Sequence, residues 1–61
     1  MERMFNAKVT LQTNADEQTI IEYVIEAGSY VDAMREAMYE TNKRFQPKNY
    51  PIKEVIIKED Q

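Results

Sequence analysis

The sequence predicts a small α+β domain, in which a three-stranded antiparallel sheet carries one helix on one face. Three observations support this fold class. Two strand-like segments open the chain, a segment with apolar residues at helical spacing follows them, and a third strand-like segment comes last. A helix between the second and third strands allows the last strand to pair with the first, which predicts the order ββαβ along the chain and 2-1-3 across the sheet. Residues 1–61 are expected to form one domain.

The two strands of the predicted hairpin differ in character. Apolar and polar residues alternate over residues 5–12, which is typical of a strand with one solvated face. Residues 13–18 are polar and lack the usual Asn-Gly or Asp-Gly pair, so we expect a hairpin loop of about four to six residues. Residues 19–27 are rich in β-branched and aromatic side chains and form the second predicted strand.

The helix is predicted from its first residues and from its apolar spacing. Gly28, the only glycine, is expected to let the chain leave the strand without a Cβ clash, and Ser29 is placed to cap a helix that begins at Tyr30. Pro47 disfavours helical geometry at Gln46, where the helix is expected to end. The apolar stripe predicted to pack on the sheet consists of Val31, Met34, Met38, Thr41 and Phe45, widened by Ala37.

The last strand is predicted over residues 52–58, followed by a solvated tail over residues 59–61. The strands and the helix together predict a hydrophobic core on one side of the sheet. Its members would be Phe5, Val9, Leu11, Ile21, Tyr23, Ile25, Val31, Met34, Met38, Phe45, Val55 and Ile57.

The length of the chain limits how much core it can form. A chain of 61 residues buries only about 60% of the surface that its unfolded form exposes. The sequence contains no Cys and no His, so neither a disulfide nor a Cys/His metal site can supplement the core. Self-association is the remaining common way to stabilise such a domain, and we expect a homodimer with no metal and no cofactor.

Charge and hydropathy narrow the possible partners and the compartment. Eight Lys and Arg against eleven Asp and Glu give a net charge of −3, which disfavours nucleic acid as a partner. No apolar run approaches the roughly 18 residues of a membrane span, and the N-terminus lacks the pattern of a signal peptide. These features predict a cytoplasmic protein with no membrane contact.

Apolar residues are expected on both faces of the sheet, although the helix can cover only one. Ile20, Val24 and Ile56 are predicted on the uncovered face, together with Ile52. They are either ordinary exposed aliphatic residues or a self-association surface. The unpaired edges of the second and third strands offer a second route to association.

Several chemistries are disfavoured by the residues that are missing. Without Cys and His the usual nucleophile and base pairs are absent, and one isolated glycine cannot form a phosphate-binding loop, so an enzyme is not expected. Acidic residues at regular spacing, with one tyrosine, could instead contact a basic partner surface, or they could form a solvated face. These candidate partner-binding residues are Glu22, Glu26, Glu36, Tyr39 and Glu40.

Two other functions are considered beside protein binding. Lys8, Lys53 and Lys58 offer weak support for a single-stranded nucleic-acid-binding accessory protein, because no aromatic residue is assigned to the same face. A structural subunit of a larger assembly is the third possibility.

The order of features resembles the small uracil-DNA glycosylase inhibitors of Bacillus phages. The resemblance is carried by residues 9–12, Glu22-Tyr23, Gly28-Ser29 at the start of a helix with Asp32 and Tyr39, and a last strand rich in Ile and Lys. It covers the order of features over most of the chain but few identical positions, and the helix is longer here. The resemblance implies an acidic DNA mimic that acts as a dimer on a host DNA-repair enzyme in the host cytoplasm. Glu26, Tyr39 and the helix flank would then contact the partner.

Overall fold

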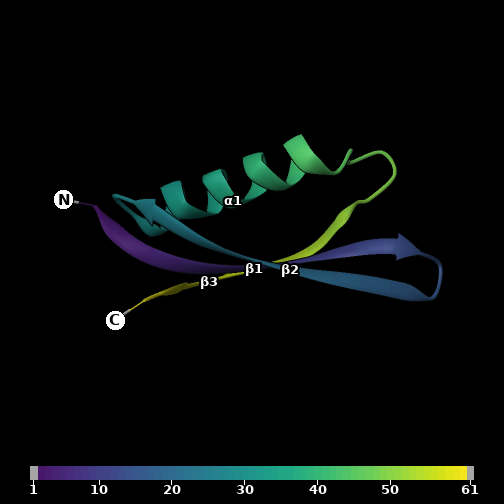
Figure 1. Cartoon of the computed structure of the whole chain (residues 1–61), viewed down its shortest axis with the longest axis horizontal. Coiled ribbons are helices and arrows are strands. Elements are labelled where there is room, and N and C mark those ends of the chain that lie inside the picture. The colour runs from purple at the N-terminus through teal and green to yellow at the C-terminus, as the bar shows by residue number, and fades with distance from the viewer. Residues whose placement is uncertain (1, 61) are drawn as a thin grey trace.

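The computed structural model describes residues 2–60, which form a three-stranded antiparallel sheet with one helix across one face (Figure 1). The elements are β1 (Arg3–Asn14), β2 (Glu17–Ala27), α1 (Tyr30–Arg44) and β3 (Ile52–Glu59). The strand order is β2-β1-β3, so the predicted fold class and topology are confirmed. Among the described residues, no helix is both long and apolar enough to cross a membrane.

The hairpin is longer and its turn tighter than predicted. Only Ala15 and Asp16 separate β1 from β2, where four to six loop residues were expected. The Asn14 side chain bridges the turn, because its Oδ1 accepts a hydrogen bond from the Asp16 amide at 2.9 Å and its Nδ2 donates to Glu17 Oε1 at 2.7 Å. The tip of the hairpin therefore extends well past the C-terminal end of α1, and the molecule is elongated, with extents of 40 × 19 × 14 Å (Figure 1).

The core lies between the sheet and α1, and the central strand supplies most of it. Four alternate residues of β1 are fully or almost fully buried, as the alternation in the sequence predicted. The buried apolar residues are Phe5, Ala7, Val9, Leu11, Ile25, Ala27, Ala33, Ala37 and Ile57, with Ile21, Tyr23, Phe45, Ile52 and Val55 partly buried against them.

The predicted contact face of the helix is correct only in part. Ala37 and Thr41 are buried as predicted, and Phe45 is partly buried, but the larger apolar residues of the helix are not. Val31 is 60% exposed, and Met34 and Met38 are each 39% exposed, whereas Ala33, Ala37 and Thr41 are fully buried. The buried residues lie four apart and so share one face of the helix. Because alanine side chains are short, the helix can approach the sheet closely on this face. The larger apolar residues lie on the flank beside it.

A bulge accounts for a second wrong prediction, the placement of Ile52 on the uncovered face. The pairing of β1 with β3 shifts between Thr10, opposite Glu54, and Leu11, opposite Ile52, so that Lys53 has no counterpart. The extra residue reverses the alternation. Ile52 is therefore partly buried against the core instead of pointing away from it.

The junction between β2 and α1 confirms one prediction and corrects another. The Ser29 side chain accepts a hydrogen bond from the Asp32 amide at 3.2 Å, so Ser29 is the N-cap of a helix that begins at Tyr30. Gly28, however, does not have a positive φ, and a Cβ added there would meet no atom within 4 Å. Its expected role in avoiding a clash is not supported.

The C-terminal ends also differ slightly from the predicted bounds. The last helical residue is Arg44 rather than Gln46, and the amide of Phe45 closes the helix on the Thr41 carbonyl at 2.8 Å. Residues 59 and 60 of the predicted solvated tail are bound to the sheet. Glu59 is the last residue of β3, and the Asp60 amide donates a hydrogen bond to the Met4 carbonyl at 2.8 Å. Gln61 lies outside the described residues.

Candidate interaction surfaces

The face of the sheet opposite α1, called the open face below, is formed by Asn6, Lys8 and Thr10 of β1 and by the residues paired with them on β2 and β3. Ile20 and Val24 are 54% and 66% exposed there, and Ile56 is 37% exposed. The prediction that apolar side chains emerge from the face that the helix leaves uncovered is therefore confirmed for these three residues. Whether they mediate self-association stays a prediction.

The strand register shows how these apolar residues are distributed over the open face. Lys8 of β1 lies between Glu22 of β2 and Ile56 of β3. The two adjacent cross-strand rows repeat this mixture, with one apolar member each, in the order Val24, Asn6, Lys58 and the order Ile20, Thr10, Glu54. The apolar groups therefore lie at the two edges of the sheet, separated by a polar central strand.

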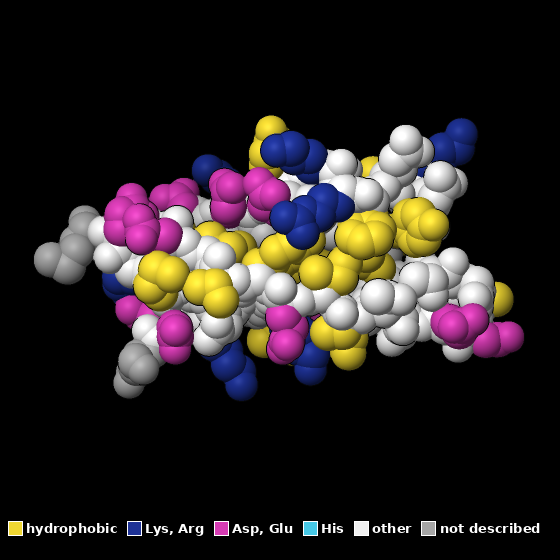
Figure 2. Space-filling view, in the orientation of Figure 1, with side chains coloured by type: hydrophobic (Ala, Val, Ile, Leu, Met, Phe, Trp, Pro, Cys, Tyr) yellow, Lys and Arg dark blue, Asp and Glu magenta, His cyan; other side chains and the backbone are white. Residues whose placement is uncertain are grey.

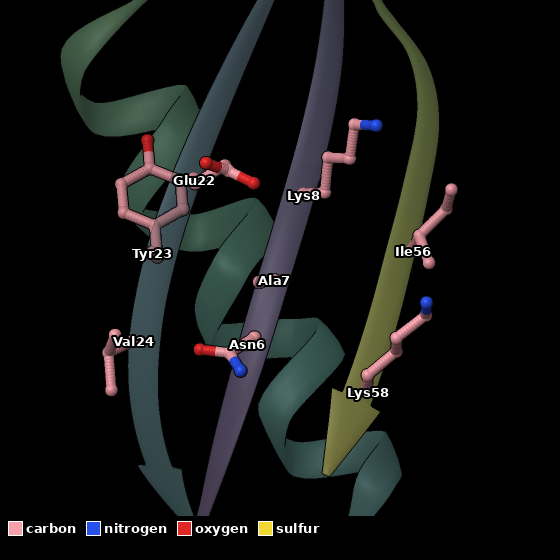
Figure 3. A pocket seen from close by; sticks show the side chains of 8 residues that line it. All are labelled: Asn6, Ala7, Lys8, Glu22, Tyr23, Val24, Ile56 and Lys58. Atoms are coloured by element: carbon pink, nitrogen blue, oxygen red, sulfur yellow. The ribbon is translucent and has the colours of Figure 1, made fainter. Parts of the chain in front are cut away.

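A shallow hollow of about 460 Å³ lies on this face. Figure 3 shows Lys8 rising from β1, with Glu22 and Val24 on β2 and with Ile56 and Lys58 on β3. A second hollow adjoins it, where Lys8 is joined by Lys53 and Ile20. The bulge brings Lys53 to this face next to Glu54, so the three lysines named in the sequence lie near one another but are accompanied by carboxylates.

The acidic residues predicted to contact a partner divide between two surfaces. Glu26, Glu36 and Glu40 line one hollow between β2 and α1, together with Arg44. The helical residues of this group are four apart and therefore share the flank of α1 that faces β2. Glu22 instead lies on the open face.

The surface between β2 and α1 is called the acidic flank below, and it consists of Glu26, Glu36 and Glu40. Its carboxylates are not matched by an equal number of cations, because Arg44 is the one basic residue that lines the same hollow in the described part of the chain. The Arg44 guanidinium carbon lies 5.5 Å from the centre of the Tyr23 ring, so it packs on the aromatic face. Figure 2 shows carboxylates gathered over one end of the helix, with an apolar band between helix and sheet.

Tyr39 lies apart from the acidic flank, on the outer side of α1, and is 62% exposed. The Lys43 Nζ lies 5.8 Å from the centre of the Tyr39 ring. An exposed aromatic ring beside a cation is available to a partner without any rearrangement of the core.

Sequence reasoning missed one surface completely, the flank of α1 that faces β3. This apolar flank consists of Val31, Met34 and Met38, which were assigned to the core. The signal that could have found it is the spacing of Ala33, Ala37 and Thr41, since three small residues at i, i+4 and i+8 mark a close approach of helix and sheet.

No group of acidic residues within residues 2–60 is arranged to hold a metal ion. The surfaces found here are shallow and carry mixed charge and apolar contact area, which suits contact with a macromolecule better than enclosure of a small ligand. Comparisons with protein-family models, with curated proteins and with solved structures return no match for this chain.

Proposed function

We propose that the chain is a non-enzymatic protein-binding module that acts as a homodimer and inhibits a host enzyme that processes nucleic acid. The observation that carries the proposal is the combination of exposed apolar residues outside the core with a separate acidic flank. The apolar residues provide contact area for association, and the carboxylates provide charge complementary to a basic groove.

The acidic flank supports the choice of partner class. Glu36 and Glu40 lie one helical turn apart on a rigid element, and Glu26 comes from the adjacent strand edge. Carboxylates held on regular elements have fixed spacing, as the phosphates of a nucleic-acid strand have. A basic groove that binds nucleic acid would therefore find a comparable arrangement of negative charge on this surface.

The resemblance in the order of sequence features selects uracil-DNA glycosylase as the first enzyme to test, and phage as the proposed origin of the chain. The assay measures uracil excision from an oligonucleotide at increasing amounts of the purified chain. The proposal predicts inhibition that weakens as the salt concentration rises, because contacts between exposed charges are screened. Full excision in the presence of excess chain at low salt would rule out this enzyme as the partner.

A matched pair of variants tests the role of the acidic flank. Glu36→Gln with Glu40→Gln removes two charges from the flank, and Asp16→Asn with Glu17→Gln removes two from the hairpin tip. Inhibition should fall in the first variant and persist in the second. Equal loss in both would mean that net charge, and not the position of the carboxylates, determines binding.

The gathering of Lys8, Lys53 and Lys58 on the open face favours a second candidate, an accessory protein that binds single-stranded nucleic acid. This function predicts affinity for labelled oligonucleotides that falls steeply with salt and decreases in Lys8→Ala. Absence of binding at low salt would remove it. Glu22 and Glu54 on the same face weaken the positive potential that such binding requires.

A further inference from the structure

We propose that two copies of the chain associate through the free edges of β3, in the antiparallel register that places Ile56 opposite the partner's Ile56. This inference rests on the proposed function, since it specifies the contact that forms the homodimer. The product would be a continuous sheet of six strands in the order β2-β1-β3-β3-β1-β2, with both helices on the same side.

The backbone of β3 has hydrogen-bonding groups free for this contact. The Asp60 amide donates to the Met4 carbonyl, which shows that the even-numbered residues of β3 turn their amides and carbonyls toward β1. The odd-numbered residues then turn theirs outward. At the free edge, opposite to the side that β1 occupies, the amides of Val55 and Ile57 and the Val55 carbonyl therefore have no strand partner, whereas the Ile57 carbonyl accepts a hydrogen bond from the Tyr30 hydroxyl.

The side chains of β3 are complementary to themselves in the proposed register. Glu54 falls opposite the partner's Lys58, and Lys58 falls opposite the partner's Glu54, so the two copies form two pairs of opposite charge. Val55 falls opposite the partner's Ile57 on the face that the helices cover, and Ile56 meets its own copy on the open face. Every residue from 54 to 58 is therefore matched in charge or in apolar character.

Neighbouring registers lack this match. If the pairing is shifted so that Val55 lies on the symmetry axis, Glu54 falls opposite the partner's Ile56. If Ile57 lies on the axis, Glu54 falls opposite the partner's Asp60, which has the same charge. The alternation of the edge groups allows only shifts that keep odd residues opposite odd residues, so no intermediate register exists.

The other free edge, that of β2, cannot associate with itself in the same way. Its charged residues are Glu17, Glu22 and Glu26, with no Lys or Arg, so no register gives it an ion pair with a second copy. Carboxylates along an edge strand are instead a common protection against unwanted strand pairing. The contrast between the two edges favours β3 as the site of association.

The proposed β3 contact also accounts for the exposed apolar flank of α1. The Tyr30 hydroxyl donates to the Ile57 carbonyl, and Glu36 and Glu40 line the hollow with β2, so the side of the helix that carries Met34 and Met38 faces the β3 edge. Neighbouring strands are about 4.8 Å apart, so helices above the two β1 strands would lie about 14 Å from each other.

This separation exceeds the roughly 8 to 10 Å of directly packed helices. Long, flexible methionine side chains are suited to fill such a gap. Met34 and Met38 of the two copies would then lose the exposure that they have in the single chain.

The hydrogen bond from Tyr30 does not prevent the contact. A carbonyl oxygen has two lone pairs, so the Ile57 carbonyl can accept from Tyr30 and from an amide of the second copy. The Tyr30 ring packs edge-on against Phe5, at 5.6 Å between ring centres, and thus lies on the helix side of the sheet rather than in line with it.

The direct test uses the absence of cysteine from the chain. In the proposed register Ile56 forms a non-hydrogen-bonded pair, with Cα atoms about 4.5 Å apart, which is within the range of a disulfide. Ile56→Cys should therefore form a covalent dimer on mild oxidation at low micromolar concentration. Val24→Cys is the matched control, because Val24 lies on the same face and is more exposed, at 66% against 37%.

Charge exchange provides a second, independent test of the register. Glu54→Lys should raise the dissociation constant of the dimer about tenfold, equivalent to about 1.4 kcal/mol, because two attractive pairs become repulsive. Combining Glu54→Lys with Lys58→Glu should return the dissociation constant to that of the unmodified chain, because both pairs are attractive again. Within one chain the two positions are about 13 Å apart along the strand, so rescue can come only from pairing between copies.

The results of these experiments distinguish failure of the proposed β3 contact from failure of the proposed homodimer. Selective cross-linking through position 56 together with rescue supports the β3 contact. A dimer that cross-links equally through position 24, or that the charge exchange leaves unchanged, overturns the contact but retains the homodimer. A chain that remains monomeric in sedimentation at all concentrations overturns both, and far-UV circular dichroism confirms that each variant is folded.

Discussion

Replacing Ala37 by Leu tests which face of α1 packs on the sheet. Ala37 is fully buried, between Ala33 and Thr41 on the face that approaches the sheet most closely. Leucine adds three carbon atoms where no space is open to solvent, so either the helix must move outward or the side chain must leave its preferred rotamer. Insertions of this kind cost about 1 to 3 kcal/mol.

That cost is large compared with the total stability of the chain. At about 0.05 to 0.15 kcal/mol per residue, a chain of 61 residues has a free energy of unfolding of about 3 to 9 kcal/mol. A loss of 1 kcal/mol lowers the melting temperature of such a domain by about 4 to 8 °C. Ala37→Leu should therefore lower the midpoint by at least about 4 °C.

The assay is urea and thermal unfolding followed by far-UV circular dichroism, at one fixed protein concentration because a dimer makes stability depend on concentration. Met38→Leu is the control, since it changes an adjacent residue that is 39% exposed and nearly conserves volume, and it should cost less than about 0.5 kcal/mol. If Met38→Leu destabilises the fold more than Ala37→Leu does, the helix is rotated and the assignment of its buried face is wrong.

Three further predictions concern local features of the fold. Ser29→Ala should lower the free energy of unfolding by about 0.5 to 2 kcal/mol in the same urea titration, because it removes the acceptor for the Asp32 amide. An unchanged midpoint would show that the cap does not contribute to stability. Gly28→Ala should be neutral or stabilising by up to about 1 kcal/mol, because the added Cβ meets open space and the unfolded chain has less conformational entropy. Clear destabilisation would contradict the backbone geometry at this position. Arg3→Gln should cost no more than about 1 kcal/mol, since its 3.1 Å ion pair with Glu59 is exposed to solvent, and a larger loss would indicate a stronger role for this pair.

The topology could be predicted from the sequence because local patterns determine it. The alternation in β1 assigns its buried face, Ser29 marks the start of the helix, and one helix between two strands leaves the last strand free to pair with β1. These signals depend on nearest neighbours along the chain and need no knowledge of the tertiary packing.

The contact face of the helix could not be predicted in the same way. Hydrophobicity alone favours Val31, Met34 and Met38 as the residues that contact the sheet. Packing, however, depends on the shape of side chains as well as on their apolar character. Ala33 and Ala37 allow a closer approach, which carries the larger side chains to the flank. An apolar stripe on a helix therefore does not identify the face that is buried when small residues form a second stripe beside it.

The misplaced Ile52 and the short hairpin turn have a common physical cause. Bulges change the alternation of a strand by one residue, and nothing in the local sequence near Lys53 or Thr13 marks one. The candidate acidic residues could not be divided from the sequence either. Glu22 and Glu26 have the same place in the alternation of β2, but Glu22 lines the hollow of the open face whereas Glu26 lines the hollow beside α1.

Sedimentation equilibrium of the unmodified chain, over a range of micromolar concentrations, tests the central claim most directly. The account predicts a mass that rises to twice the 7.2 kDa of one chain and then stays constant, because a symmetric contact closes on itself. A constant mass of 7.2 kDa would contradict the claim that the exposed apolar residues serve self-association, and growth beyond the dimer would contradict a closed symmetric contact.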